Sequence, residues 1–179
     1  MRTLWALLAL ALLAGCGFQL RGAPQYQQLE SLTLLGGSFD LHDGLINALE
    51  ASDVLVHDAS PHTLQIGSER IDRRTVAVDS QGRAAEIELR YTFTWQLLDS
   101  RTQSAITPRR RITLVRSFNY DPENATASSD EELYTRADMH RDATWQLLRQ
   151  LDAAVRALAI GEPADQGPAQ SPPLETEQP

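Results

Sequence analysis

The sequence predicts an α+β fold in which two helices pack on one face of a four-stranded, mixed or antiparallel sheet, in the order β-α-β-β-β-α. Three observations predict it. Residues 39–51 have a helical repeat of apolar positions, residues 85–98 alternate between apolar and polar, and a second, longer helical pattern closes the folded part. Elements that are apolar on one side only must bury that side against each other, so helices and sheet share one core.

The first strand and helix lie near the N-terminal end of this region. Residues 29–35 are a short apolar strand that stops at Gly36 and Gly37. A helix follows over about 39–51, because Leu41, Leu45, Ile46 and Leu49 share one helical face. Residues 54–56 can add only a brief strand.

Three longer strands form an antiparallel meander. Residues 64–78 alternate between apolar and polar, but the apolar residues change from even to odd positions partway along. This change predicts a bulge near 68–70. The clearest strand is 85–98, with one buried and one wet face. Polar turns at 79–82 and 99–104 flank it, and residues 106–120 form the next strand. The buried face of the middle strand is predicted to hold Ile87, Leu89, Tyr91, Phe93, Trp95 and Leu97.

The last element is a long helix that ends before Gly161 and Pro163. Ser128 and Ser129 each precede a glutamate by three residues, which predicts two overlapping capping boxes at its start. At a rise of 1.5 Å per residue, the predicted helix is roughly 40 Å long. Its core-facing positions are predicted to be Leu133, Ala137, His140, Thr144, Leu147, Leu151, Val155 and Leu158.

The charge balance narrows the classes of function. The chain has 179 residues, 24 acids and 16 basic residues, all of them arginine, for a net charge of -8. This acidity argues against nonspecific nucleic-acid binding, which depends on neutralising phosphates. Three parts are predicted: a signal peptide at 1–15, one folded domain at 16–160, and a disordered, proline-rich acidic tail at 161–179.

The N-terminal segment predicts a lipid anchor. An arginine precedes an apolar run at 4–14, which is too short for a bilayer span of ~20 residues. The run ends in Leu13-Ala14-Gly15-Cys16, which resembles the bacterial lipobox, so Cys16 is the predicted site of lipidation. An ordinary signal peptide with an incidental cysteine is the alternative. Gly17 at the second mature position favours the outer membrane by resemblance to lipoprotein sorting rules.

The sequence contains no catalytic pattern. The four histidines lack metal-ligand spacing, and there is no nucleophile elbow, Walker loop or dinucleotide fingerprint. The prediction is therefore a protein that is not an enzyme, with no cofactor and no metal.

The positions of the arginines are the remaining indication of function in the sequence. Arg73, Arg74, Arg83 and Arg90 lie on or beside the meander strands, and 109–111 open the next one. Arginine grips phosphate through a planar fork, so these residues are candidates for binding an anionic, phosphorylated amphiphile. A solvated sheet edge protected by charge is the alternative. In the alternation of its strand, Arg116 falls on the same side as apolar neighbours, so we expect its charge to need a partner within the fold.

Four stretches together resemble one family. They are Cys16 to Gly22, Ala85-Glu86, Arg116 to Tyr120, and the last helix from Glu131 through Gln146-Leu147-Leu148-Arg149. With the element order and the tail, the chain resembles the LptE family of LPS-assembly lipoproteins. No single motif is specific to this family, but the ordered set of motifs is.

The resemblance implies an outer-membrane lipoprotein that plugs and helps assemble the LptD barrel and inserts lipopolysaccharide into the outer leaflet. Arg73, Arg74, Arg83 and Arg90 become candidate lipopolysaccharide contacts, and Arg116, Phe118 and Tyr120 candidate contacts with LptD. Two basic positions tied to lipopolysaccharide in the family align with Ser80 and Ser128, a departure that Arg83 offsets only at the first. The alternatives are a free periplasmic carrier of an anionic lipid and an uncharacterised lipoprotein hydrolase.

Overall fold

The computed structural model describes residues 29–160 of the chain. Two helices and five strands occur in this part, in the order β1 (Ser31–Leu35), α2 (Phe39–Glu50), β2 (Leu55–Val56), β3 (His62–Val78), β4 (Ala84–Asp99), β5 (Arg110–Asn119) and α3 (Ala125–Ile160). None of the described helices is long and apolar enough to cross a membrane.

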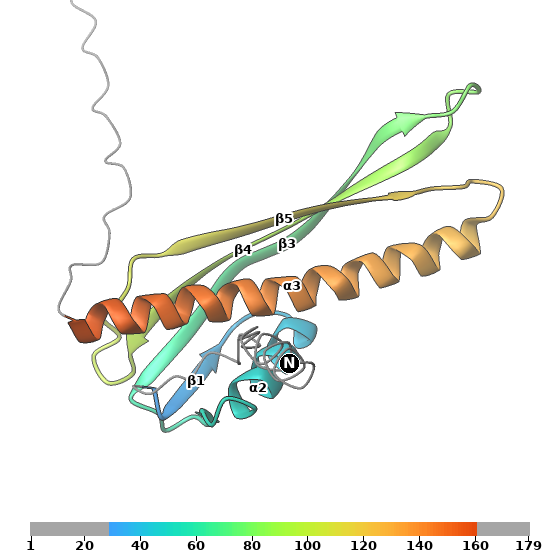
Figure 1. Cartoon of the computed structure of the whole chain (residues 1–179). Helices are drawn as coiled ribbons and strands as arrows, with labels where there is room; N and C mark the ends of the chain where they lie inside the picture. The colour runs from blue at the N-terminus through green and yellow to red at the C-terminus, as the bar shows by residue number, and fades with distance from the viewer. Residues whose placement is uncertain (1–28, 161–179) are drawn as a thin grey trace, which may run out of the picture.

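The strands form a single mixed sheet in the order β2-β1-β3-β4-β5. β1 is parallel to β2 and β3, whereas β3, β4 and β5 make the antiparallel meander. The predicted four-stranded sheet is therefore five-stranded, because the brief strand β2 joins its edge. Both helices lie on the same side of the sheet, and the β3–β4 hairpin extends beyond α2 toward the end at which α3 begins (Figure 1). The α+β class is confirmed.

The core lies between the sheet and the two helices. The predicted alternation of β4 is confirmed, since Ile87, Leu89, Tyr91, Phe93 and Trp95 are fully buried. From the other side the core receives Leu41, Leu45 and Leu49 of α2 and Met139, Ala143, Leu147, Leu148, Leu151 and Ala154 of α3.

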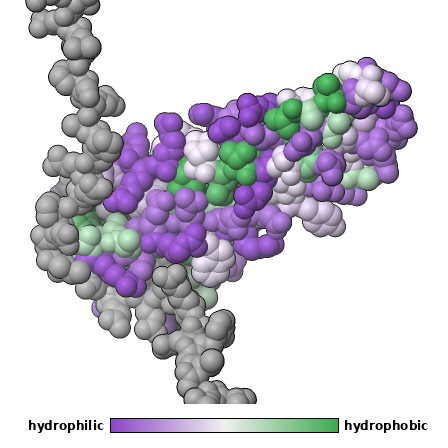
Figure 2. All heavy atoms as spheres, turned by 45° about the horizontal axis from the view of Figure 1, so that its top comes forward, coloured by the Kyte–Doolittle hydropathy of each residue, from purple (hydrophilic) through white to green (hydrophobic). Residues whose placement is uncertain are grey.

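The face of β3, β4 and β5 opposite the helices, called the open face below, is covered by no described element. Figure 2 turns the upper side of the molecule toward the viewer, and its surface there is mostly hydrophilic, with hydrophobic side chains in patches. Val115 on this face and Val76 and Val78 near the end of the hairpin are exposed. The prediction of a polar, open opposite face is thus confirmed for most of this surface.

The predicted bulge in β3 is present. The β3–β4 register shifts between Gly67 and Arg70, and Ser68 has a positive φ of 53°. The extra residue turns Glu69 toward the helix side, where its carboxylate accepts hydrogen bonds from the Ser38 hydroxyl at 2.6 Å and the Tyr91 hydroxyl at 2.5 Å. Ser38 is the N-cap of α2, so the bulge ties the start of this helix to the sheet.

The start of α3 differs from the prediction. The helix begins at Ala125, and the hydroxyl of Ser129 donates to the carbonyl of Ala125 within it. The hydroxyl of Ser128 instead bonds the backbone of Asp121. The predicted capping boxes are therefore wrong, because both serines lie within the helix instead of preceding it. With 36 residues, α3 is about 54 Å long rather than 40 Å.

The predicted buried face of α3 is confirmed in the middle of the helix and wrong at its two ends. Thr144, Leu147 and Leu151 are buried, whereas Leu133 is 65% exposed and Leu158 is 39% exposed. Met139 and Ala143, which were not predicted, are fully buried. Apolar residues recur at three- and four-residue steps on two neighbouring stripes of this helix, and periodicity alone does not say which one meets the sheet.

β5 begins later than expected, at Arg110 rather than 106. Pro108 has no N–H to give to the sheet. In this approach to the strand the Thr107 hydroxyl accepts a hydrogen bond from the backbone N–H of Leu97 at 2.9 Å.

Candidate functional site

The predicted lipidation site and tail lie outside the described residues. Cys16 precedes residue 29, and 161–179 follow residue 160. Lipidation of Cys16, the signal peptide and the tail therefore stay predictions.

Two of the four predicted ligand arginines, Arg74 and Arg90, lie on the open face. Arg74 grips Glu88 with two hydrogen bonds, of 2.8 Å from Nε and 3.0 Å from Nη2. Arg90 Nη2 reaches the same carboxylate at 3.2 Å. The hydrogen bond from Arg74 lowers the pKa of Glu88 and raises the pKa of Arg74. Both cations are thus already paired with an internal anion.

Arg83 lies at the tip of the β3–β4 hairpin. Its Nε donates to Asp79 at 2.8 Å and its Nη1 to Glu123 at 3.0 Å. The backbone N–H of Arg83 and then its guanidinium lower the pKa of Asp79. Because Glu123 lies between β5 and α3, Arg83 joins the hairpin tip to the turn before the last helix.

Arg73 lies on the opposite side of the sheet, since it pairs with buried Leu89 in the β3–β4 register. Its Nε donates to Glu132 of α3 at 3.2 Å, and its guanidinium lies 5.4 Å from the ring centroid of Tyr120. The four arginines therefore do not converge on one patch: two share the open face, one caps the hairpin, and one faces α3.

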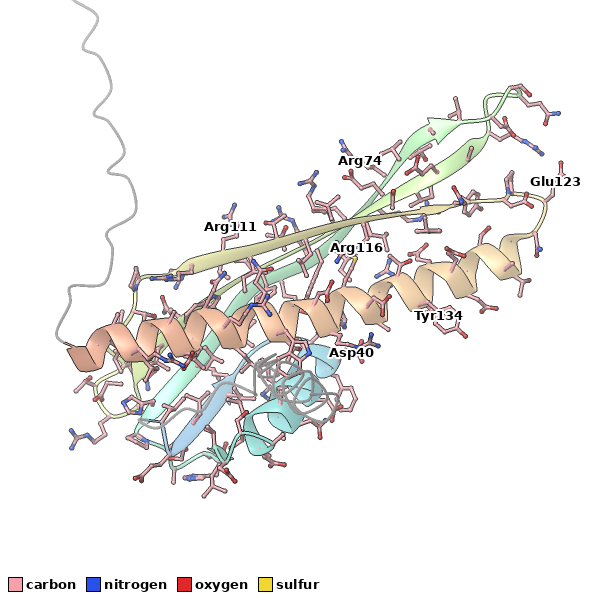
Figure 3. The ribbon with its side chains drawn as sticks, in the orientation of Figure 1. Asp40, Arg74, Arg111, Arg116, Glu123 and Tyr134 are labelled. Carbon is pink, nitrogen blue, oxygen red and sulfur yellow. The ribbon has the colours of Figure 1, made fainter. Side chains whose placement is uncertain are left out.

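The predicted partner contacts are distributed between core and surface. Arg116 does lie on the helix-facing side of β5, and its guanidinium forms an ion pair with Asp142 of α3; Figure 3 shows it between the two elements. Phe118 is only 4% exposed, whereas Tyr120 is half-buried beneath Arg73. The expectation that Arg116 needs a partner is confirmed.

The polar network around Tyr91 was not predicted from the sequence. Burial first, and then the hydrogen bond to Glu69, raise the pKa of the Tyr91 hydroxyl. The ring of His140 stacks against Tyr91, with ring centroids 4.9 Å apart, and its Nδ1 lies 3.4 Å from Asp40. The phase slip in β3 was the one available signal, but it did not say what Glu69 would meet. These groups join α2, α3 and β4.

A groove of about 510 Å³ lies between α2 and α3 and reaches Ile71 of β3. Leu133 and Trp145, which are 65% and 41% exposed, line it together with charged residues such as Asp40, Asp43 and Arg136. Tyr134, next to Leu133, is 76% exposed, and Figure 3 shows it projecting on the side of α3 on which Asp40 also lies. Leu133, Tyr134 and Trp145 are therefore large apolar side chains of α3 that no described element covers.

Comparison with known proteins identifies the family. The LptE family model, described as lipopolysaccharide-assembly, matches residues 29–151, which include almost all of the described fold. The chain belongs to the LptE family. It is 35% identical over 153 residues to the LPS-assembly lipoprotein LptE of Pectobacterium atrosepticum, with 80% of each chain covered.

Solved structures share the fold of this LptE-family chain. The rare lipoprotein B from Shewanella oneidensis superposes with a TM-score of 0.63 at 22% identity, covering 72% of this chain and 98% of its own. Lipoprotein B from Nitrosomonas europaea gives 0.58 at 26% identity, covering 84% and 99%. The protein is an envelope lipoprotein of the family that takes part in lipopolysaccharide assembly.

Ser80 and Ser128, which the resemblance is expected to align with basic positions of the family, have different surroundings. Ser80 is exposed in the hairpin turn. Ser128 is 5% exposed, and its hydroxyl both accepts from the N–H of Asp121 at 2.8 Å and donates to its carbonyl at 3.1 Å. In this LptE-family member the second position therefore closes the turn into α3.

Proposed function

We propose that this LptE-family protein is a non-catalytic plug and assembly partner inside the LptD barrel of the outer membrane. It is anchored through acylated Cys16, on the periplasmic side, and acts with LptD in placing lipopolysaccharide in the outer leaflet. The observation that carries this proposal is the exposed apolar surface on the outer side of α2 and α3, in a chain whose family assembles lipopolysaccharide.

The filled core supports a plug over a free lipid carrier. A carrier needs an interior hollow lined by apolar side chains, large enough for acyl chains. Here the space between sheet and helices is occupied by Tyr91, Phe93 and Trp95, each fully buried, and by the leucines of α2 and α3. The groove of about 510 Å³ borders this filled core, and half of its lining residues are polar or charged, among them Asp40, Asp43 and Arg136.

The apolar surface supports a protein partner. Leu133, Tyr134 and Trp145 are exposed along one side of α3. Contiguous exposed apolar side chains on a soluble domain mark interaction sites, because their burial against a partner removes them from water. Arg136 and Arg141, which also line the groove, are held by Glu132 and Asp138, so its cations are neutralised.

The described polar groups support a non-catalytic role, since they hold elements together. Glu69 joins α2 to β4, and Arg116 joins β5 to α3. Arg116 and Tyr120 remain proposed contacts with LptD. For Arg73, Arg74, Arg83 and Arg90 to contact lipopolysaccharide, a phosphate must displace the carboxylate that each now binds.

Affinity purification from detergent-solubilised outer membranes tests the partner. The unaltered chain is expected to bring down a large barrel protein, and Leu133→Glu with Trp145→Glu should reduce its yield several-fold. Leu55→Glu is the matched control, because Leu55 is 64% exposed on the far edge strand β2. If no barrel accompanies the unaltered chain, the plug proposal is wrong.

The anchor is tested separately. Cys16→Ser removes the thiol that accepts the lipid, so the protein should move from the membrane pellet to the soluble periplasmic fraction after osmotic shock. Several acyl chains hold a protein almost irreversibly, whereas one chain alone binds marginally. Retention of the Cys16→Ser protein in membranes that lack the barrel partner would contradict lipidation as the anchor.

A further inference from the structure

The arginines of the described chain fall into two groups. Most have a carboxylate within hydrogen-bonding distance, including all four candidate ligand residues. Among residues 29–160, the arginines without a carboxylate oxygen within 4.0 Å are Arg101, Arg109, Arg110, Arg111 and Arg149. Three of these five are consecutive, at the start of β5. In a chain of net charge -8, an unneutralised cluster of this kind is a local exception.

Arg109 and Arg111 lie on the open face. Arg111 pairs with Thr94 in the β4–β5 register, and Arg109 Nε donates to Gln96 Oε1 at 3.2 Å. Thr94 and Gln96 alternate with buried Phe93, Trp95 and Leu97, so they face away from the helices. Both arginines are exposed, and Figure 3 shows Arg111 pointing away from α3.

The surroundings of this arginine pair are neutral and able to form hydrogen bonds. Gln96 Nε2 donates to Gln65 Oε1 at 2.7 Å, and the Thr94 hydroxyl donates to the Gly67 carbonyl at 2.9 Å. Of the acids farther along the open face, Asp72 is held by Arg70 and Glu88 by Arg74 and Arg90, whereas half-buried Glu86 lies two residues beyond Glu88 and so farther still from Arg109 and Arg111. Glu88 is six residues from Thr94 along β4, roughly 20 Å at the rise of an antiparallel strand.

We propose that Arg109 and Arg111, with Gln96 beside them, bind phosphate groups at this end of the open face. An arginine fork forms charge-assisted hydrogen bonds to phosphate oxygens, and here no internal carboxylate must first be displaced. The phosphate is carried by an amphiphile: either the phosphorylated glucosamine of lipid A or the headgroup of an anionic phospholipid. The lipid A source rests on the proposed function, whereas the phosphate site itself does not.

The test measures binding of the full-length chain, purified in a nonionic detergent, to immobilised bisphosphorylated lipid A. Arg109→Gln with Arg111→Gln should weaken binding about tenfold, since exposed charge pairs contribute modestly each. Arg149→Gln with Arg156→Gln is the matched control: it removes the same charge from exposed sites on α3 that do not line the groove, and it should change affinity less than twofold. Binding should also fall as salt rises.

A second variant guards against a folding defect. Gln96→Glu keeps every arginine and nearly the same shape, but it places a carboxylate against Arg109. It should weaken lipid A binding in the same direction, while far-UV circular dichroism stays that of the unaltered chain. Arg109→Lys with Arg111→Lys should retain part of the affinity, because the charge is kept and the fork is lost.

The possible results distinguish the two sources of phosphate from each other and from a purely protective role of the arginines. Loss of binding to dephosphorylated lipid A supports the phosphate site, and equal competition by phosphatidylglycerol assigns it to phospholipid headgroups. Unchanged affinity in both Arg109→Gln with Arg111→Gln and Gln96→Glu overturns the proposal. The cluster then serves only to protect the edge strand β5 from aggregation. Recovery of the barrel protein with the Arg109→Gln, Arg111→Gln variant is measured in the same membranes. If the barrel is recovered but lipid A binding is unchanged, the phosphate site is wrong and the plug proposal stands.

Discussion

At the scale of single residues, Tyr91 does more than fill the core. Its ring packs between Phe93 and His140, while its hydroxyl donates to Glu69, which also accepts from Ser38 at the start of α2. A buried hydroxyl that donates to a carboxylate strongly favours its protonated form. This one side chain therefore joins the sheet and both helices.

We expect this network to limit stability in alkali. The unfolded Tyr91 ionises near pH 10, and its pKa is raised in the folded protein by burial and by Glu69. Its contribution to stability is present below pH 10 and is lost as pH rises above it, because only the unfolded chain releases the proton. Urea unfolding from pH 8 to 11 should show this decline, and Tyr91→Phe should flatten it at the cost of lower stability at pH 8. Tyr134→Phe, at a 76% exposed position, should leave the decline unchanged.

At the scale of elements, the close crossing of α2 and α3 depends on Gly44. A Cβ at this position would lie 2.9 Å from Thr144 Oγ1, whose hydroxyl donates to the His140 carbonyl within α3. Threonine has restricted rotamers in a helix, so it cannot move aside freely. The helices therefore approach as closely as they do because a glycine, unfavourable for helix propensity, stands at the contact.

A double-mutant cycle tests this contact. Gly44→Ala should stabilise the protein by about 1 kcal/mol when Thr144 is alanine, because only the gain in helix propensity remains. With Thr144 present the same change should be neutral or destabilising, since overpacking costs about 1–3 kcal/mol. Chemical denaturation of the four proteins gives the coupling energy. Equal effects in both backgrounds would show that the helices do not meet here as described.

At the scale of the whole molecule, the two sides of the sheet have different chemistry. The helix side carries the core and, beyond it, an exposed apolar row on α3. The open face carries paired arginines toward the hairpin tip and unpaired arginines at the start of β5. A plug that must touch both a protein wall and a phosphorylated lipid needs two such surfaces, which is how the proposed function uses them.

The same division predicts which leucines matter for folding. Leu147→Ala should lower the free energy of unfolding by about 2–5 kcal/mol, because Leu147 is fully buried in the core. Leu133→Ala should change it by less than about 0.5 kcal/mol, because Leu133 is 65% exposed. Guanidinium unfolding of both variants in one detergent compares them directly. A large loss at Leu133 would mean that the outer row belongs to the fold rather than to a docking surface.

Local sequence patterns predicted much of the fold. The alternation of β4, the leucine spacing of α2 and the phase slip of β3 each predicted the element that is observed, because burial of one face imposes a period of 2 or 3.6 on neighbouring residues. The sequence did not predict that Leu133 and Leu158, at the two ends of the α3 stripe, are exposed, because apolar residues recur on more than one face of this helix and only packing against the sheet selects which are buried. The false caps at Ser128 and Ser129 arose because capping motifs are short and recur inside helices.

The sequence by itself determined the element order, the one-sided strands, the family resemblance, and the arginines as its only basic side chains. Only the tertiary structure decided which arginines are neutralised. Ion pairs such as Arg73 with Glu132 and Arg116 with Asp142 join residues 59 and 26 positions apart. No local period encodes such a distance. Pairing over a few ångströms depends on where strands and helices finally pack, and this left Arg109 and Arg111 unpaired on the open face.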